Sequence, residues 1–212
     1  MSCVLIIGAK SDIAKEVARE YAKNGYDLYL AGRNIDEMKD FENDIKIRSK
    51  ADVKLKEFDI TDFESHEQFY NSLEPKPLGV IVVAGYMAEQ KTCENDWSKT
   101  LNTINVNFTG AVSILNIIAN DMEQNKNGFI VGVSSVAGDR GRKANYIYGS
   151  AKAGFSAYLS GLRNRLYESG VKVLTVKPGF VNTKMTEHLD LSAKLTAESE
   201  DVASDIYNAQ QK

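Results

Sequence analysis

Three residues in the second half of the chain have the types and spacing of an acid–base site. Ser135 is followed thirteen residues later by Tyr148, and Lys152 lies four residues beyond the tyrosine. Positions i and i+4 share one face of a helix, so we expect Lys152 to lie beside Tyr148. A phenol loses its proton only near about pH 10, and a nearby ammonium group favours the phenolate. The pattern predicts a tyrosine that exchanges protons during catalysis, although a core tyrosine with a surface lysine has the same spacing.

Short apolar runs alternate with amphipathic stretches and must position these residues. The apolar runs are typical of strands buried on both faces of a parallel sheet and lie at about 4–7, 28–31, 53–59, 80–83, 129–133 and 171–176. Helical patterns follow them at about 13–22, 35–48, 63–73, 97–124, 148–168 and 199–212. We predict a single α/β domain over residues 1–212, a Rossmann-type doubly wound parallel sheet in three layers (α-β-α).

The carboxyl ends of the predicted strands describe one crevice, which is where ligands bind in sheets of this class. The segments at those ends are Gly8 to Ile13, Gly32 to Asn34, Asp59–Ile60, Ala84–Gly85, Ser134–Ser135 and Pro178 to Thr183. Gly8 ends a strand just before a helix, so this turn is predicted to present backbone N–H groups to a phosphate. A plain structural turn is the alternative at this position.

Together these blocks resemble the short-chain dehydrogenase/reductase family over nearly the whole chain. The first turn of that family usually reads Gly-x-x-x-Gly-x-Gly; here Gly8 is kept, whereas Asp12 and Ala14 replace the second and third glycines. We expect Asp12 to cap the helix and to bring a negative charge near the pyrophosphate, which Lys10 would partly offset. The segment Val82–Gly85 also departs from the family, because it lacks the usual two asparagines before Ala-Gly.

The resemblance implies roles for individual residues. Ser135, Tyr148 and Lys152 match the family's catalytic residues, and Asn107 matches the asparagine that completes the tetrad by holding a water and bending the long helix. Asp59 would meet the adenine ring, and Thr183 would contact the nicotinamide carboxamide. The full set of expected cofactor-binding residues is Gly8, Lys10, Ser11, Asp12, Ile13, Arg33, Asp59, Ile60, Ala84, Gly85, Tyr148, Lys152, Pro178, Gly179, Val181 and Thr183.

The end of the second strand indicates which nicotinamide cofactor is used. An NAD enzyme has a carboxylate there for the ribose 2′-hydroxyl, whereas this chain has Gly32-Arg33-Asn34. The planar guanidinium of Arg33 suits a 2′-phosphate, so we expect NADP(H) to be favoured over NAD(H). A solvated surface arginine is the alternative.

A narrower resemblance concerns the loop before Tyr148 and the segment after Val181. Residues 139–154 and 181–189, with the altered glycine turn, are similar to the branch that contains the decaprenylphosphoryl keto-sugar reductases. This resemblance implies reduction of a ketone on a lipid-linked sugar. The cations Arg140, Arg142, Lys143 and Lys184 would face a phosphate-bearing substrate, or would form a solvated basic loop. Residues 184–198 are expected to form a substrate lid.

Composition and charge argue against several classes of function. The formal net charge is −3 with both signs interspersed, so we expect no nucleic-acid partner. Cys3 and Cys93, the latter in an expected polar loop, have neither metal-ligand spacing nor a disulfide pattern, which fits a reducing cytoplasm and predicts no metal. We find no signal peptide and no apolar stretch long enough for a bilayer, so membrane contact is expected only through an absent C-terminus.

The sequence thus predicts an NADP(H)-dependent oxidoreductase that interconverts a small-molecule ketone and a secondary alcohol. A catalytically silent nucleotide-binding sensor or partner subunit is the alternative, favoured by the altered glycine turn. A Rossmann-like methyltransferase is a weaker alternative, because it would not need the Ser, Tyr and Lys set. The resemblance also implies a homodimer or homotetramer paired through the long helix and the Tyr148 helix, and a C-terminal seventh strand that this chain lacks.

Overall fold

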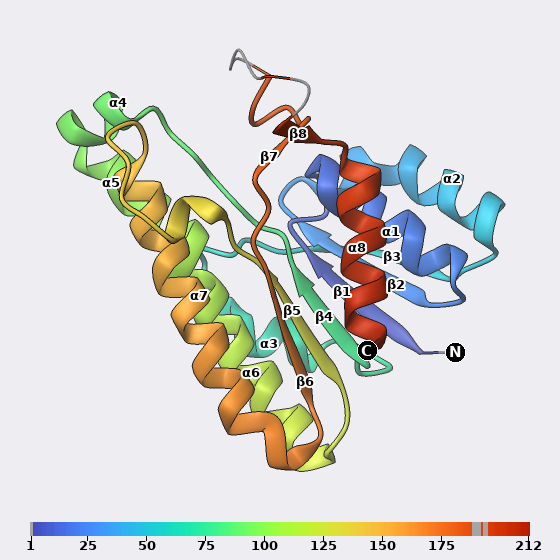
Figure 1. Cartoon of the computed structure of the whole chain (residues 1–212). Helices are drawn as coiled ribbons and strands as arrows, with labels where there is room; N and C mark the ends of the chain where they lie inside the picture. The colour runs from blue at the N-terminus through green and yellow to red at the C-terminus, as the bar shows by residue number, and fades with distance from the viewer. Residues whose placement is uncertain (1, 188–191, 193–194) are drawn as a thin grey trace.

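A six-stranded parallel sheet forms the middle layer of the molecule (Figure 1). The computed structural model describes residues 2–187, 192 and 195–212. The strands are β1 (Cys3–Ile7), β2 (Asp27–Gly32), β3 (Val53–Glu57), β4 (Gly79–Val82), β5 (Phe129–Val133) and β6 (Lys172–Val176). Their order is β3-β2-β1-β4-β5-β6, and every neighbouring pair is parallel. The order reverses between β1 and β4, so the predicted doubly wound sheet is confirmed and its crevice lies at these two strand ends.

Helices cover both faces of the sheet (Figure 1). One face carries α1 (Asp12–Lys23), α2 (Lys39–Ser49) and α8 (Ser199–Gln211), and the other carries α3 (His66–Asn71), α6 (Gly110–Asn125) and α7 (Tyr146–Leu166). Short 3-10 turns at Ile35–Met38 and Phe63–Ser65 precede α2 and α3. In β1, Leu5 and Ile7 enter one core while Val4 and Ile6 enter the other. This burial on both faces explains the continuous apolar runs in the sequence.

The long helix is present and is irregular where Asn107 was predicted to bend it. Helix α5 (Trp97–Ile104) passes through a π-helical turn at Asn105–Thr109 into α6. This run of 29 residues is long and apolar enough, by length and composition, to cross a membrane, contrary to the expectation that no such stretch occurs. Its side chains Ile114, Leu115 and Ile118 are buried in the core, as in a core helix of a globular domain.

Other differences from the prediction lie at element ends and in short elements. Strand β3 stops at Glu57 and not at Asp59, because the Asp59 carboxylate turns to accept the N–H of Thr61. An unpredicted helix, α4 (Gln90–Asn95), buries Cys93, which the sequence had placed in a polar loop. An unpredicted parallel pair, β7 (Phe180–Val181) and β8 (Thr196–Ala197), brackets the expected lid. Residues 188–191 and 193–194 of that lid lie outside the described residues.

Candidate active site

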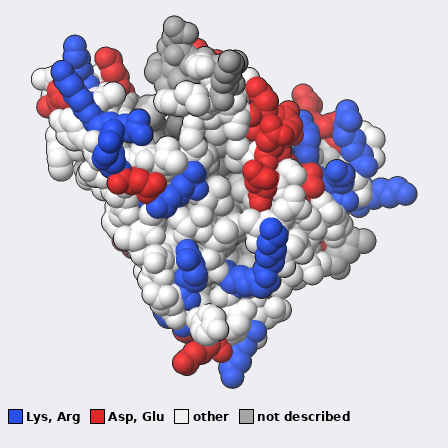
Figure 2. Space-filling model, in the orientation of Figure 1, with Lys and Arg blue, Asp and Glu red and all other residues white. Residues whose placement is uncertain are grey.

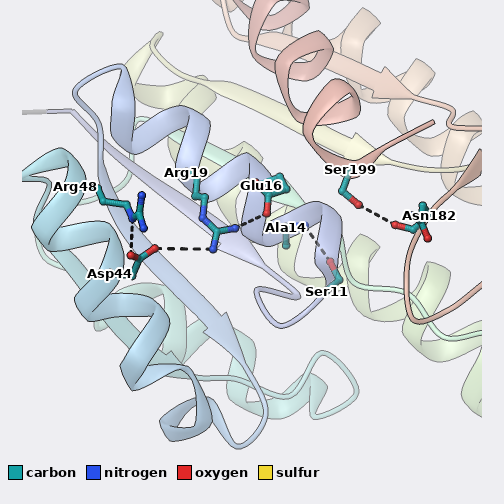
Figure 3. A network of polar contacts seen from close by, with 8 residues as sticks. All are labelled: Ser11, Ala14, Glu16, Arg19, Asp44, Arg48, Asn182 and Ser199. Atoms are coloured by element: carbon teal, nitrogen blue, oxygen red, sulfur yellow. Dashed lines mark hydrogen bonds and ion pairs between the residues drawn. The ribbon is translucent and has the colours of Figure 1, made fainter. Parts of the chain in front are cut away.

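The turn after β1 is built for close contact with the end of β4. Gly8 has a φ of 85°, and a Cβ there would lie 2.5 Å from the backbone nitrogen of Ala84. Ser11 caps α1, because its Oγ accepts the N–H of Ala14 at 3.2 Å (Figure 3). The first N–H groups of α1 have no acceptors within the helix and lie at the positive end of its dipole. This turn can therefore hold a phosphate.

The charges of Lys10 and Asp12 are engaged by protein groups. Asp12 Oδ2 accepts a hydrogen bond from the backbone N–H of Lys184 at 2.8 Å, and Lys10 Nζ pairs with Glu37 Oε2 at 2.5 Å. The prediction that Asp12 caps the helix is wrong, because Ser11 occupies that position. Lys10 pairs with Glu37 and makes no contact with Asp12 among the interactions described, so the expected offset of the Asp12 charge stays a prediction. Asp12 instead ties the start of α1 to the start of the expected lid.

The segment after β6 crosses the same edge of the sheet. The carbonyl of Pro178, which precedes Gly179, accepts the N–H of Val136 at 3.1 Å. Val181 is buried, and the carbonyl of Asn182 accepts the hydroxyl of Ser199 at 3.2 Å (Figure 3). Thr183 lies 3.2 Å from the Thr186 hydroxyl, Oγ1 to Oγ1. These contacts place the predicted segment from Pro178 to Thr183 at the carboxyl ends of the strands.

Arg33 and Asp59 lie together at the ends of β2 and β3. The Arg33 side chain is 66% exposed, and its Nη1 is 4.0 Å from Asp59 Oδ2. Burial opposes ionisation of Asp59, but hydrogen bonds from Thr61 and the charge of Arg33 prevail and hold the pKa of this carboxyl below its usual value. Ile60, next in the chain, is buried against Gly110, where a Cβ would lie 2.0 Å from the Ile60 carbonyl oxygen.

Glu57 is a site residue that the sequence prediction missed. Its two carboxylate oxygens accept the N–H groups of Asn34 at 2.9 Å and Ile35 at 3.0 Å. It thereby shapes the loop that carries Arg33. An acidic residue at the carboxyl end of the neighbouring strand was the available signal.

Tight packing of the turn after β5 against α7 brings Ser135 to Tyr148. A Cβ on Gly149 would lie 2.6 Å from the carbonyl oxygen of Ala137, and one on Gly138 would lie 2.7 Å from the backbone nitrogen of Ala153. Burial raises the pKa of Tyr148, while the nearby Ser135 hydroxyl lowers it, and burial prevails. The two predicted hydroxyls therefore lie close together.

Lys152 is buried beside Tyr148, as the spacing predicts. Its Nζ donates to the carbonyl oxygen of Val133 at 3.0 Å and lies 5.8 Å from the centre of the Tyr148 ring. Burial lowers the pKa of Lys152 to about 8. Lys152 was expected to lower the pKa of Tyr148, but burial raises that pKa, and the contribution that opposes burial comes from Ser135 and not from Lys152.

Asn107 binds the loop after β4. Its Nδ2 donates to the carbonyl oxygens of Tyr86 at 2.6 Å and Thr103 at 2.8 Å, and its Oδ1 accepts the N–H of Tyr86 at 3.3 Å. A Cβ on Gly85 would lie 3.5 Å from Asn107 Oδ1 and 3.9 Å from Lys152 Nζ. The structure thus brings Asn107 and Lys152 together at Gly85, next to the Ala84 that packs on Gly8.

The surface around this site is divided by charge. Arg140, Arg142 and Lys143 form an exposed basic loop before α7, and Figure 2 shows Lys and Arg side chains gathered over that end of the molecule. Acidic side chains gather on the other side, where the first turn of α8 carries Glu200 and Asp201. Within the described residues, no group of three or more His, Cys, Asp or Glu side chains is arranged to hold a metal ion.

Known proteins are similar to this chain in sequence. Residues 2–194 match the family model for short chain dehydrogenases. An uncharacterized oxidoreductase of Mycobacterium tuberculosis is 37% identical over 204 residues, which are 95% of this chain and 81% of that protein. An uncharacterized oxidoreductase of Streptomyces coelicolor is 32% identical over 209 residues, covering 96% of this chain and 81% of that protein.

Solved structures show the same similarity. A short-chain dehydrogenase from Sphingobium yanoikuyae in complex with NADPH has a TM-score of 0.89 and 23% identity, covering 99% of this chain and 84% of that chain. ElxO with NADP bound has a TM-score of 0.88 and 23% identity, covering 99% of this chain and 91% of that chain. These matches support the fold described above.

Proposed function

The chain belongs to the short-chain dehydrogenase family and is an oxidoreductase of that type, and from this premise we propose that it interconverts a ketone and a secondary alcohol with NADP(H). One observation carries the proposal: Tyr148 and the buried Lys152 on α7 meet Ser135, from the turn after β5, beside the crevice that starts at Gly8. A pair of neighbouring hydroxyls next to a buried amine is suited to proton exchange with a substrate oxygen.

The residues present fit a nicotinamide dinucleotide. Gly8 has no Cβ, so the turn after β1 can lie directly against Ala84. The start of α1 offers N–H groups for the pyrophosphate. Arg33 extends into solvent at the end of β2, where a guanidinium suits a 2′-phosphate. Complexes of similarly folded proteins with NADPH and NADP support the same choice.

The chain's own residues would carry out the proton chemistry of the reaction. A bound nicotinamide supplies or accepts hydride at the reacting carbon. Tyr148 donates a proton to the carbonyl oxygen during reduction, and Ser135 donates a hydrogen bond to the same oxygen. The ammonium of Lys152 stabilises the phenolate that remains on Tyr148, and Asn107 fixes the loop around Gly85.

We further propose a polar, sugar-like substrate that carries an anionic group. Arg140, Arg142 and Lys143 are exposed on the loop that leads into α7, close in sequence to Tyr148. Their positive charge favours an anionic group such as a phosphate on this side of the site. The acidic start of α8 disfavours it on the other side (Figure 2).

A titration with NADPH and NADH tests the proposed function, with nicotinamide fluorescence as the readout. We expect micromolar binding of NADPH and at least tenfold weaker binding of NADH. Arg33→Ala should weaken NADPH binding about tenfold and leave NADH binding unchanged. Arg48→Ala is the matched control, because Arg48 pairs with Asp44 on α2 away from the crevice (Figure 3). Tyr148→Phe should bind NADPH like the wild type while ketone reduction falls at least a thousandfold.

Each contrary outcome has a distinct meaning. Preference for NADH would overturn the choice of cofactor but keep the oxidoreductase. Full activity of Tyr148→Phe would remove the proton-transfer mechanism. Binding of neither nucleotide would favour the alternative of a silent sensor or partner subunit, in which Asp12 closes the turn after β1.

A further inference from the structure

Asp12 makes a long-range contact that its place on α1 does not require. Its Oδ2 accepts the backbone N–H of Lys184 at 2.8 Å, across 172 positions of the chain. The side-chain cap of α1 is Ser11, so the helix does not need the Asp12 carboxylate for that purpose. The contact therefore indicates a role for Asp12 at Lys184, outside its own helix.

Lys184 belongs to a tight turn after β7. The N–H of Thr186 donates to the carbonyl of Thr183 at 3.0 Å, so Lys184 and Met185 are the two central residues of a β-turn. The hydroxyl of Thr186 also donates to the last carbonyl of β7 at 2.6 Å, which joins the turn to that strand. Asp12 holds the same turn from the side of α1, at the first of its central residues. The place of Met185 therefore depends on this bond.

The Met185 side chain reaches the catalytic end of the crevice. A Cβ on Gly85 would lie 3.6 Å from Met185 Cε. The same point lies 3.5 Å from Asn107 Oδ1 and 3.9 Å from Lys152 Nζ. The thioether methyl group therefore shares the space beside Gly85 with two residues of the proposed catalytic set. Met185 is 38% exposed, so the greater part of it is covered in this position.

The chemistry of the proposed reaction brings the nicotinamide to this end of the crevice. Hydride and proton add to the two atoms of one carbonyl group, so the nicotinamide must lie close to the Tyr148 hydroxyl. Lys152 Nζ lies 5.8 Å from the centre of the Tyr148 ring, so Met185 is at the same end. A thioether side chain is apolar and adaptable and makes favourable contacts with aromatic rings. Met185 is thus suited to cover the nicotinamide and to keep water from it.

We propose that Asp12 is a positioning residue which, through the turn at Lys184, holds Met185 as an apolar cover over the nicotinamide end of the crevice. The identity of the covered ligand rests on the proposed function, whereas the link from Asp12 to Met185 does not. The first turn of α1 then serves the nucleotide twice. Its backbone N–H groups bind the pyrophosphate, and the Asp12 carboxylate places Met185.

Limited trypsin digestion of the nucleotide-free protein tests the link between Asp12 and the turn. Trypsin cuts after lysine and arginine, and a new fragment end at Met185 identifies the cut after Lys184 by mass spectrometry. Asp12→Ala removes the acceptor and should raise the rate of this cut about fivefold or more. Asp12→Asn removes the same charge but keeps an oxygen that accepts the Lys184 N–H, so it should be cut at the wild-type rate. The cut after Arg142, in the exposed basic loop, should be unchanged and controls for general unfolding.

Acrylamide quenching of the fluorescence of bound NADPH tests the cover. At saturating NADPH, Met185→Ala should raise the quenching constant about twofold or more, because the nicotinamide becomes open to solvent. Asp12→Ala should raise it by a similar factor, and the double variant should raise it no further, because both substitutions remove one contact. Asp12→Asn should again behave as the wild type.

The contrary outcomes separate the link, the cover and the proposed function. If Asp12→Ala is cut after Lys184 no faster than the wild type, or Asp12→Asn is cut as fast as Asp12→Ala, Asp12 does not hold the turn. Unchanged quenching in Met185→Ala, or additive effects in the double variant, would overturn the role of Met185 as a cover placed by Asp12. If the wild type binds no NADPH, the proposed function and the cover fail together, while the digestion still decides whether Asp12 holds the turn.

Discussion

At the scale of single residues, burial controls the chemistry of the site. Lys152 is 3% exposed, and the titratable groups around it do not offset the desolvation that lowers its pKa to about 8. Tyr148 is moved in the opposite direction for the same physical reason, because burial disfavours the phenolate as it disfavours the ammonium. Both residues are therefore held nearer to their neutral forms than they would be in water.

Because the Lys152 ammonium is buried, we predict that replacing this lysine with an apolar residue raises the free energy of unfolding. The size of this gain should depend on pH. The pKa falls from 10.5 to about 8 on folding, which corresponds to roughly 3 kcal/mol of destabilisation at pH 7. Between about pH 8 and 10.5 the unfolded chain binds a proton that the folded chain has released, so the wild type's free energy of unfolding rises with pH in this window. Lys152→Met should be about 2 kcal/mol more stable at pH 7, after loss of the hydrogen bond to Val133, and this advantage should vanish towards pH 10.5.

Urea denaturation of the nucleotide-free protein at pH 7, 8.5, 9.5 and 10.5 measures this effect. Lys23→Met is the control, since the Lys23 side chain is 78% exposed and its removal should leave stability within about 0.5 kcal/mol at every pH. A difference between Lys152→Met and the wild type that stays constant with pH would contradict the assignment of a buried, charged lysine.

At the scale of elements, the site depends on close contacts between turns and neighbouring strands. Gly8 against Ala84 and Gly149 against Ala137 are contacts that a Cβ would prevent. The first contact holds the ends of β1 and β4 together, and the second holds the turn after β5 against α7. Together they form one site.

Gly8→Ala should disrupt both folding and nucleotide binding. The φ of 85° costs an alanine about 1 kcal/mol, and the Cβ would also lie 2.5 Å from the Ala84 nitrogen and force β1 and β4 apart. We expect a loss of about 3 kcal/mol or more in the free energy of unfolding and at least tenfold weaker NADPH binding. Gly25→Ala isolates the backbone effect, because Gly25 has the same φ and nothing within 4 Å. Similar losses in the two variants would show that the contact with Ala84 is unimportant.

Elements with a strong apolar pattern could be predicted from the sequence, and those held by polar contacts could not. The six strands, α1 and α7 follow from buried runs and stripes such as Val4–Ile7. Helix α4 has a polar sequence in which only Gln90 and Cys93 are buried, so it gave no periodic signal. Strands β7 and β8 have two residues each and are fifteen residues apart in the chain. Segments this short have no hydrophobic pattern, so their pairing could not be predicted.

The same distinction applies to the site. Ser135, Tyr148, Lys152 and Gly8 were predictable because their spacing reflects one helix face and one strand end. The partner of Asp12 and the acceptor of the Ile147 N–H group were not predictable. The first is Lys184, which is 172 positions from Asp12, and the second is Gln90, which is 57 positions from Ile147.

At the scale of the whole molecule, charge and exposed apolar surface are unevenly distributed. Basic and acidic side chains gather on different parts of the face in Figure 2, and the first turn of α8 carries the acidic residues Glu200 and Asp201. Trp97 is 69% exposed and Leu101 is 42% exposed on the first two turns of α5. These residues lie one turn apart, so they present a joint apolar surface on the helix through which the family resemblance implies pairing.

We predict that this surface of α5 is buried between two copies of the chain. Light scattering should give at least twice the monomer mass of 23.5 kDa, and Leu101→Asp should give the monomer, because a charge in an apolar interface is costly. Trp97 is the single tryptophan, so its fluorescence emission should shift to longer wavelength in the same variant. Ile47→Asp is the matched control: Ile47 is 81% exposed on α2, and its substitution should leave mass and emission unchanged. If Leu101→Asp keeps the wild-type mass, the chain associates through another face, and Trp97 and Leu101 remain in contact with solvent.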